Sequence, residues 1–366
     1  MSELLQQAFR DQRVLVTGHT GFKGSWLSLW LARLGAQVSG YALAPPTTPA
    51  MFEVCRVADV MDHALGDVRD RASLSRRITE VRPRVIFHLA AQPLVRQSYV
   101  DPLETLQTNV MGTAHVLDAV REANLACAIV VVTSDKCYDN REWVWGYREN
   151  DPMGGKDPYS MSKGATELVT ASWRESFFPP SGPVKLASAR AGNVIGGGDW
   201  AADRIIPDCV RAFAQGTAVE LRSPRATRPW QHVLEPVLGY LMLAQRLLSA
   251  QGEHYCSGWN FGPAPADVRP VEQVVALMAQ GWGPACRWHT AQAASFKEAF
   301  SLSLSCDKAA QLLGWTPAWT LEQAIAQTAR WYRAWHDGTE DMRAVTEGQI
   351  DAFQAQHPSL RPSATA

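Results

Sequence analysis

Short apolar runs alternate with longer amphipathic segments along the first half of the chain. Runs rich in β-branched residues occupy 13–17, 85–89 and 128–132, and their length and composition predict strands that are buried on both faces. Segments 25–34 and 71–81 carry apolar residues at helical spacing instead, which predicts helices. Such alternation of strand and helix is typical of a parallel sheet with helices on both faces.

The pattern becomes less regular after a further predicted strand at 184–190, where glycine-rich and charged stretches follow. We therefore expect an α/β protein, in which a Rossmann-type doubly wound parallel sheet carries a smaller mixed α/β C-terminal domain that binds substrate. The boundaries that we predict are 1–190, completed by about 233–262, for the first domain, and 191–232 with 263–355 for the second. The tail 356–366, rich in Pro, Ser and Ala, is expected to be disordered.

A glycine-rich turn joins the first predicted strand to the first helix. Glycines in this place let the backbone turn tightly and approach a pyrophosphate, which binds amide groups at the helix N-terminus. The turn therefore predicts a dinucleotide site made of Gly18, Thr20, Gly21, Phe22, Lys23 and Gly24. The second strand that we predict, over 37–43, ends with neither an acidic residue nor an arginine that would choose between NAD and NADP, and we favour NAD.

Tyr159 and Lys163 stand four residues apart at the head of a segment with helical character, so their side chains project from one face. An ammonium beside a phenol favours the phenolate, and we expect it to lower the pKa of Tyr159 from about 10 towards neutrality. Ser134, at the end of the strand 128–132, is placed to hold the same alcohol oxygen. The trio has the logic of an alcohol oxidation site, although Y-x-x-x-K also occurs by chance on many helices.

Further motifs follow the predicted elements in order: Asp67-Val68, His88-Leu-Ala-Ala91 and Asn109-Val-Met-Gly112. Together with the glycine turn, Ser134 and the Tyr159/Lys163 pair, they resemble the extended short-chain dehydrogenase/reductase superfamily, in its nucleotide-sugar-modifying branch. Three longer stretches, at 133–140, 190–200 and 225–236, are similar to those of the CDP-glucose 4,6-dehydratases.

This resemblance implies a redox-neutral dehydration of CDP-glucose that uses bound NAD. Hydride leaves C4 of the hexose, the C5 proton and the C6 hydroxyl are lost, and hydride returns to C6 to give a 4-keto-6-deoxy sugar. The residues to which it assigns catalysis are Ser134, Asp135, Lys136, Tyr159 and Lys163. By position Asp135 would be the acid for the C6 hydroxyl and Lys136 the base at C5, which requires a partly neutral lysine. The alternative for Lys136 is electrostatic stabilisation of the enolate.

The resemblance also implies binding residues beyond the glycine turn. Besides Tyr159 and Lys163, further cofactor contacts would come from Asp67, Val68, Leu89, Ala90, Ala91 and Asn109. Substrate contacts would come from Gln92, Asn193, Arg204, Arg228 and His232, since arginine forks suit a diphosphate. A homodimer is implied as well, with segments 103–123 and 159–177 paired across its axis. We interpret His19 as a loop residue near the cofactor and His88 as a hydrogen-bonded strand histidine.

Composition and charge exclude several other classes. A net charge of −1 over 366 residues carries no footprint for nucleic acid or an anionic membrane, and no apolar run approaches the length of a membrane span. The seven cysteines form no C-x-x-C pair and no metal-ligand cluster with histidine. We therefore expect no metal, and we expect a cytoplasmic protein, because scattered free thiols suit a reducing compartment.

Two alternatives remain open at this stage. One is another nucleotide-sugar enzyme, either a 4-epimerase or a dehydratase for a GDP- or dTDP-sugar; an epimerase has no need of the acid and base pair that Asp135 and Lys136 would form. The other is a non-catalytic NAD-binding scaffold on the same fold, which Tyr159 and Lys163 argue against.

Overall fold

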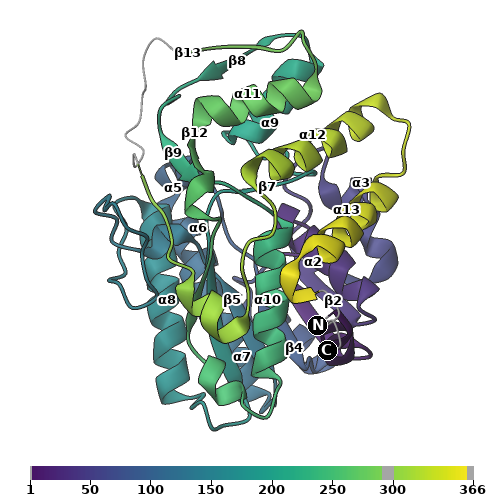
Figure 1. Ribbon diagram of the computed structural model, residues 1–366. Helices are drawn as coiled ribbons and strands as arrows, with labels where there is room; N and C mark the ends of the chain where they lie inside the picture. Colours follow the sequence, from purple (N-terminus) through teal and green to yellow (C-terminus); the bar gives the residue numbers. More distant parts are fainter. Residues whose placement is uncertain (1, 291–300, 361–366) are drawn as a thin grey trace, which may run out of the picture.

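A parallel sheet forms the centre of the computed structural model, which describes residues 2–290 and 301–360 (Figure 1). Its seven strands lie in the order β11-β6-β5-β4-β1-β2-β3. The strands are β1 (Arg13–Thr17), β2 (Gln37–Ala42), β3 (Asp62–Leu65), β4 (Val85–His88), β5 (Ala128–Val132), β6 (Lys185–Ala191) and β11 (Gly258–Phe261). The strand order reverses between β1 and β4, so the predicted doubly wound parallel sheet is confirmed.

Helices cover both faces of the sheet because its central strands are buried and apolar on both sides. Val14 and Val16 of β1 pack into one core with the helices α2 (Phe22–Arg33) and α10 (Leu234–Leu247). Leu15 packs on the opposite face. The helices on that face are α4 (Arg71–Val81), α7 (Gly112–Glu122) and α8 (Pro158–Ser176). The helix predicted over 71–81 is thus confirmed.

Smaller elements build the second part of the chain, at the top of Figure 1. Two-stranded sheets pair β7 (Val194–Ile195) with β10 (Gln231–His232), β8 (Ala218–Leu221) with β13 (Arg287–Thr290) and β9 (Thr227–Pro229) with β12 (Val268–Pro270). The helices α9 (Ile205–Ala214), α11 (Val271–Trp282) and α12 (Leu321–Asp337) pack beside them. Between these elements in the chain, β11 returns to the main sheet and pairs with β6.

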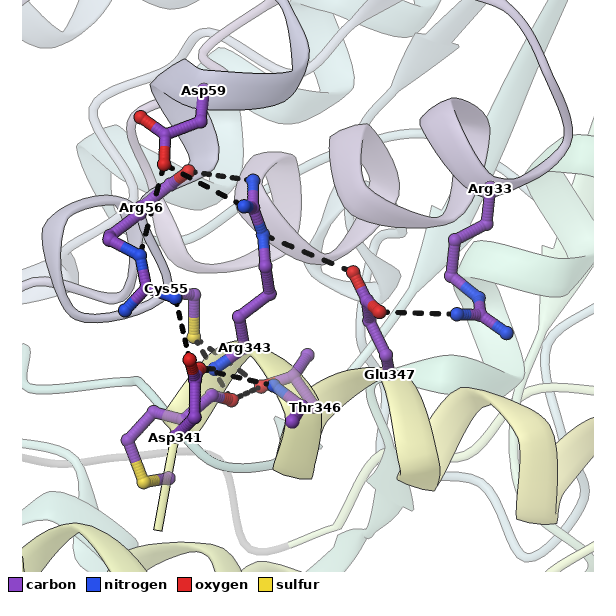
Figure 2. Close-up of polar contacts among 10 residues, drawn as sticks. Arg33, Cys55, Arg56, Asp59, Asp341, Arg343, Thr346 and Glu347 are labelled. Atoms are coloured by element: carbon purple, nitrogen blue, oxygen red, sulfur yellow. Dashed lines mark hydrogen bonds and ion pairs between the residues drawn. The ribbon is translucent and has the colours of Figure 1, made fainter.

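The C-terminal helix α13 (Met342–Gln356) packs against the segment after β2 and hydrogen-bonds to it. That segment contains α3 (Met51–Val54) and the short helix η1 (Val57–Val60). Arg56 Nη2 donates to Asp341 Oδ2 at 2.7 Å, and Arg343 Nη2 donates to the carbonyl oxygen of Arg56 at 2.9 Å (Figure 2). The Cys55 thiol lies 3.4 Å from the Thr346 hydroxyl in the same group. The chain at Cys55 and Arg56, between α3 and η1, is therefore held by the first turns of α13.

The predicted disorder of the tail is wrong for residues 356–360. Gln356 ends α13, a short helix spans Pro358–Leu360, and Leu360 is buried. Residues 361–366 lie outside the described residues. All seven cysteines are free, and within the described ranges no helix has the length and apolarity needed to cross a membrane.

Candidate active site

The glycine turn lies between β1 and α2 at the carboxyl end of the sheet. Gly18 has φ +78°, and a Cβ atom on it would overlap the backbone of Ala90. A Cβ atom on Gly24 would overlap the carbonyl group of Gly18, while the Gly21 amide donates to that carbonyl at 3.1 Å. The backbone is therefore drawn tightly together at the N-terminus of α2, which fits a dinucleotide pyrophosphate.

The side chains of the other turn residues contact neighbouring parts of the fold. The Thr20 hydroxyl donates to the carbonyl oxygen of Leu43 at 2.8 Å, which ties the turn to the end of β2. The Phe22 ring lies against Gly196, on the loop that follows β7. Burial, with the charges of Lys163 and Arg204, lowers the pKa of Lys23 to about 7. Lys23 is thus close enough to the residues around Tyr159 to be influenced by their charges.

The turn after β4 lies beside the glycine turn, as expected for Leu89, Ala90 and Ala91. The Ala90 amide donates to the Thr17 hydroxyl at 3.3 Å, and the Leu89 amide donates to the Thr17 carbonyl at 3.1 Å. His88 is buried, with its ring nitrogens 2.7 Å from Thr17 Oγ1 and 3.0 Å from Thr113 Oγ1. Burial, then the charge of Lys163, lowers the pKa of His88 to about 3. The prediction of a hydrogen-bonded strand histidine is confirmed.

His19 and the Asp67-Val68 motif occupy the neighbouring edge. The His19 ring is buried, and its Nε2 lies 2.7 Å from His63 Nδ1, so it has the place of a packing residue rather than a base. Arg69 Nε donates to both carboxylate oxygens of Asp67, at 3.1 Å to Oδ1 and 2.8 Å to Oδ2. Val68 packs so closely on α7 that a Cβ atom on Gly112 would lie 2.8 Å from its methyl group. This contact explains the glycine of the Asn109-Val-Met-Gly112 motif.

Ser134, Asp135 and Lys136 form the candidate catalytic segment, which follows β5. Its last two residues begin a short helical turn, η3 (Asp135–Cys137). Ser134 Oγ donates to Asp135 Oδ1 at 2.9 Å and accepts the Lys136 amide at 3.2 Å. Ser134 and Asp135 are buried. The carboxylate of Asp135 fills the space beside Gly192, where a Cβ atom would overlap it. The loop after β6 therefore forms one wall of the segment.

Helix α8 brings Tyr159 and Lys163 to this segment. The helix begins at Pro158, and Asp157 caps it by accepting the Ser160 amide at 2.9 Å. Lys163 Nζ lies 6.0 Å from the centre of the Tyr159 ring, and Lys136 Nζ lies 5.9 Å from it. The structure thus brings together all five residues that the resemblance singled out for catalysis.

The pKa of Tyr159 differs from the expectation. Burial raises it to about 12, with the charge of Asp135 acting in the same direction, while a hydrogen bond with Ser134 and the charge of Arg204 oppose the rise. Burial also lowers the pKa of Lys163 to about 8. The expected lowering towards neutrality is therefore wrong for the protein by itself, because desolvation of the phenolate is the largest influence.

Asn109 hydrogen-bonds to residues that surround the site. It lies in a π-helical turn, η2 (Gln107–Met111), between α6 (Pro102–Leu106) and α7, and such turns often occur at functional sites. Its side chain accepts the Gln92 amide at 2.8 Å and donates to Ser162 Oγ at 2.8 Å. Ser162 in turn donates to the Tyr159 carbonyl oxygen. Asn109 therefore connects to Tyr159 through Ser162.

Two of the predicted substrate residues, Gln92 and His232, have their side chains packed or hydrogen-bonded within the protein. The Gln92 side chain bonds to Leu94 and Thr105 within its own part of the fold. His232 is fully buried, with its ring against Trp26 and Trp319. Neither position supports the expected sugar contact, since neighbouring groups already occupy these side chains.

Asn193, Arg204 and Arg228 remain better placed for a ligand. Arg204 Nη1 lies 2.8 Å from Asp199 Oδ2, and its charge influences Tyr159 and Lys23. Asn193 follows Gly192 with φ +31°. Arg228 lies on β9, where its Nη1 donates to the Thr227 carbonyl oxygen. These residues come from the loops that leave the sheet.

A buried polar group behind the catalytic segment was not predicted. It centres on Glu167 of α8 and Arg190 of β6, whose Oε2 and Nη2 atoms lie 2.8 Å apart. Glu167 stands four residues after Lys163, so helical spacing alone could have placed it below the site. The partner 23 positions later carries no such local signal.

Comparisons with known proteins agree with this geometry. A family model described as GDP-mannose 4,6 dehydratase matches residues 15–328. A curated CDP-glucose 4,6-dehydratase of Salmonella typhimurium is 51% identical over 351 residues, which cover 95% of this chain and 97% of the relative.

Solved structures share the fold. The UDP-glucose 4-epimerase of Thermus thermophilus in complex with NAD superposes with a TM-score of 0.75 at 24% identity, covering 88% of this chain and 99% of its own. The dTDP-glucose 4,6-dehydratase of Streptomyces venezuelae, with NAD bound, gives a TM-score of 0.73 at 22% identity, covering 90% and 99%. The family model over residues 15–328 and the full-length relative show that the chain belongs to the GDP-mannose 4,6 dehydratase family.

Proposed function

We propose that the protein catalyses the NAD-dependent dehydration of CDP-glucose to CDP-4-keto-6-deoxyglucose. The observation that carries the proposal is the grouping of Ser134, Asp135 and Lys136 against Tyr159 and Lys163. This group has an acid and a base candidate beyond those that an alcohol oxidation requires. The choice of CDP-glucose among nucleotide sugars follows the Salmonella relative, which is 51% identical over almost the whole chain.

The glycine turn supports NAD as the cofactor. Bound NAD+ supplies a hydride acceptor for C4 and the same hydride for return to C6. The protein's part is to hold it: Gly18 and Gly24 admit close backbone approach, and the N-terminus of α2 faces the diphosphate. Leu89, Ala90, Ala91, Asp67 and Val68 form the adjoining edge, where we propose the remaining cofactor contacts.

Tyr159 is the proposed base for the C4 hydroxyl. Ser134, which is hydrogen-bonded to Tyr159, holds the same oxygen. The ammonium of Lys163, 6.0 Å from the ring centre, favours the phenolate once the proton has moved. Oxidation at C4 makes the C5 proton acidic, because the ketone can stabilise the resulting enolate.

Asp135 and Lys136 are the proposed elimination pair. Lys136 takes the C5 proton, and Asp135 gives a proton to the C6 hydroxyl, which leaves as water. Return of hydride to C6 and of a proton to C5 then completes a reaction with no net oxidation. The alternative for Lys136, stabilisation of the enolate by its charge, uses the same position beside the Tyr159 ring.

The loops beyond the sheet are the proposed nucleotide-sugar-binding domain, over 191–232 and 263–355. Arg204 and Arg228 are proposed to bind the diphosphate, and Asn193 to contact the sugar nucleotide beside Gly192. Bidentate arginine contacts suit such an anion. Because Asp199 already pairs with Arg204, the substrate has to share this arginine with a carboxylate.

We also propose a homodimer in the cytoplasm. Exposed apolar side chains gather on the helices that precede and include α8: Val100 (78% exposed), Leu103 (68%), Met111 (49%), Met161 (40%) and Leu168 (62%). A surface of this kind is typical of a protein interface. Seven free cysteines suit a reducing compartment.

The test is to incubate the purified protein and NAD+ separately with CDP-glucose, dTDP-glucose, UDP-glucose and GDP-mannose. Mass spectrometry then follows each sugar for the loss of one water. We expect loss from CDP-glucose alone. Loss from another sugar would overturn the substrate assignment and keep the chemistry, while loss from none of them would overturn the dehydratase.

A further inference from the structure

Glu167 and Arg190 form a buried ion pair directly behind the catalytic segment. Their side chains are only 4% and 5% exposed, and Arg190 Nη2 lies 2.8 Å from Glu167 Oε2. The Ser188 hydroxyl donates to the same carboxylate oxygen at 2.6 Å. A Cβ atom on Gly258 would overlap Arg190 Nη2, so this glycine makes room for the guanidinium group.

The pair holds both ends of the segment that carries Ser134, Asp135 and Lys136. At the N-terminal end, Thr133 Oγ1 donates to Glu167 Oε1. At the C-terminal end, Arg190 Nη1 donates to the Tyr138 hydroxyl at 2.6 Å, and this hydroxyl donates to Asn260 Oδ1 at 2.7 Å. Residues 134–137 therefore form a short loop whose two flanking side chains are tied to one ion pair.

The same pair is fixed relative to Lys163. Glu167 stands one helical turn after Lys163 on α8, and its charge influences the Lys163 ammonium. Although burial by itself raises the pKa of Glu167, the charge and hydrogen bonds of Arg190, Ser188 and Thr133 leave it below its ordinary value. The carboxylate is thus ionised at neutral pH and available to all three partners.

Stability alone is a poor reason for such a pair. Desolvation of two buried charges often cancels their attraction, and well-packed apolar residues of similar volume can replace them without loss. A buried pair does fix geometry, because each charge is restricted to the few positions that satisfy its hydrogen bonds. Here those positions define where the catalytic segment begins and ends.

We propose that Glu167 and Arg190 are positioning residues, which hold Asp135 and Lys136 in place relative to Tyr159 and Lys163. This inference rests on the proposed dehydratase function, since it assigns the pair to the chemical step of that reaction. A displacement of about 1 Å in a reacting group can lower a rate about hundredfold. Loss of either tie should therefore lower kcat and leave substrate binding intact.

The test removes the two hydrogen bonds that join the segment to the ion pair, here called ties, and keeps the ion pair itself. Removal of Glu167 or Arg190 would leave a buried charge and prevent folding. Thr133→Val removes the first tie at nearly constant volume, and Tyr138→Phe removes the second while it keeps the ring. Matched controls elsewhere are Thr170→Val, which removes an intrahelical hydrogen bond of α8, and Tyr240→Phe, which removes a buried hydroxyl of α10.

We expect each tie variant to lower kcat about tenfold to hundredfold, with KM for CDP-glucose within about twofold of the wild-type value. Thr133→Ser, which keeps a hydroxyl, should restore most of the loss. The controls should keep the wild-type kcat per folded molecule, measured against circular dichroism of the same samples.

The possible outcomes separate this inference from the function on which it rests. Wild-type protein that dehydrates CDP-glucose, beside tie variants with unchanged kcat, would overturn the positioning role alone. Equal losses in the tie variants and their controls would also overturn it, because they would indicate general destabilisation. Wild-type protein that dehydrates none of the four sugars would refute the proposed function instead.

Discussion

Gly192 faces the carboxylate of Asp135 so closely that no side chain can stand between them. A Cβ atom on Gly192 would overlap Asp135 Oδ2. Asp135 also accepts a hydrogen bond from the Ser134 hydroxyl at 2.9 Å, so a shift of its carboxylate would disturb this contact. The glycine of the loop after β6 therefore determines where the proposed acid of the elimination stands.

Gly192→Ala is expected to displace Asp135 and lower kcat about hundredfold or more, since the misplaced acid can no longer protonate the leaving hydroxyl. Steady-state kinetics on CDP-glucose measure the loss. Gly348→Ala is the matched control, because no atom lies within 4 Å of its Cβ position and alanine suits a helix interior. A Gly192→Ala protein as active as this control would contradict the proposed place of Asp135.

Tyr159→Phe is expected to lower kcat about 10²- to 10⁴-fold, which is the usual contribution of a general base. The ring remains, so packing beside the two lysines should be kept. Fluorescence titration should still show NAD+ binding, because the glycine turn is untouched, and this separates lost chemistry from lost binding. Full turnover in this variant would remove Tyr159 from the mechanism and would favour a scaffold over an enzyme.

The sequence predicted the elements whose pattern is local. The helix over 71–81 could be placed because its apolar face repeats at helical spacing, and Asp70 caps it by accepting the Ser73 amide. Strand β3 was missed. Its four residues, Asp62–Leu65, include two polar side chains and form the edge of the sheet, so they make no apolar run.

The site shows the same division between local and distant causes. The spacing of Tyr159 and Lys163 is local, and in the structure Tyr159 hydrogen-bonds to Ser134 and lies beside Lys136, both in the segment after β5. The raised pKa of Tyr159 arises from burial, which depends on the helices that pack against α8, such as α5 and α6. His232 stands in a recognisable motif, but packing on Trp26 and Trp319 removes it from the site. Such packing depends on tertiary contacts that no single motif contains.

Leu168→Asp is expected to weaken the proposed homodimer. Leu168 is 62% exposed on α8, where burial against a second copy would remove an apolar side chain from water and a buried carboxylate would be costly. Light scattering coupled to size exclusion should show a dimer for the wild-type protein and a monomer for the variant. Leu312→Asp, at a position 54% exposed in the segment Ala309–Leu313 and outside the helices of the proposed interface, should remain a dimer. A wild-type monomer would refute the dimer itself.

Glu235→Gln is expected to change how stability depends on pH. Glu235 is buried, and burial raises its pKa to about 8 despite hydrogen bonds from the Ala318 and Trp319 amides. Between the ordinary value of 4.5 and about 8 the unfolded chain loses this proton while the folded protein keeps it. The free energy of unfolding therefore falls as pH rises through this window, by at most about 1.4 kcal/mol per pH unit.

The glutamine variant lacks this titration, so its stability relative to the wild-type protein should increase from about pH 5 to about pH 8 and then stay constant. Urea denaturation across this range measures the difference, and the buried histidines cancel because both proteins carry them. Glu272→Gln, at an exposed position, should follow the wild-type curve. Parallel curves for Glu235→Gln and the wild-type protein would mean that water or local rearrangement keeps Glu235 ionised in the fold.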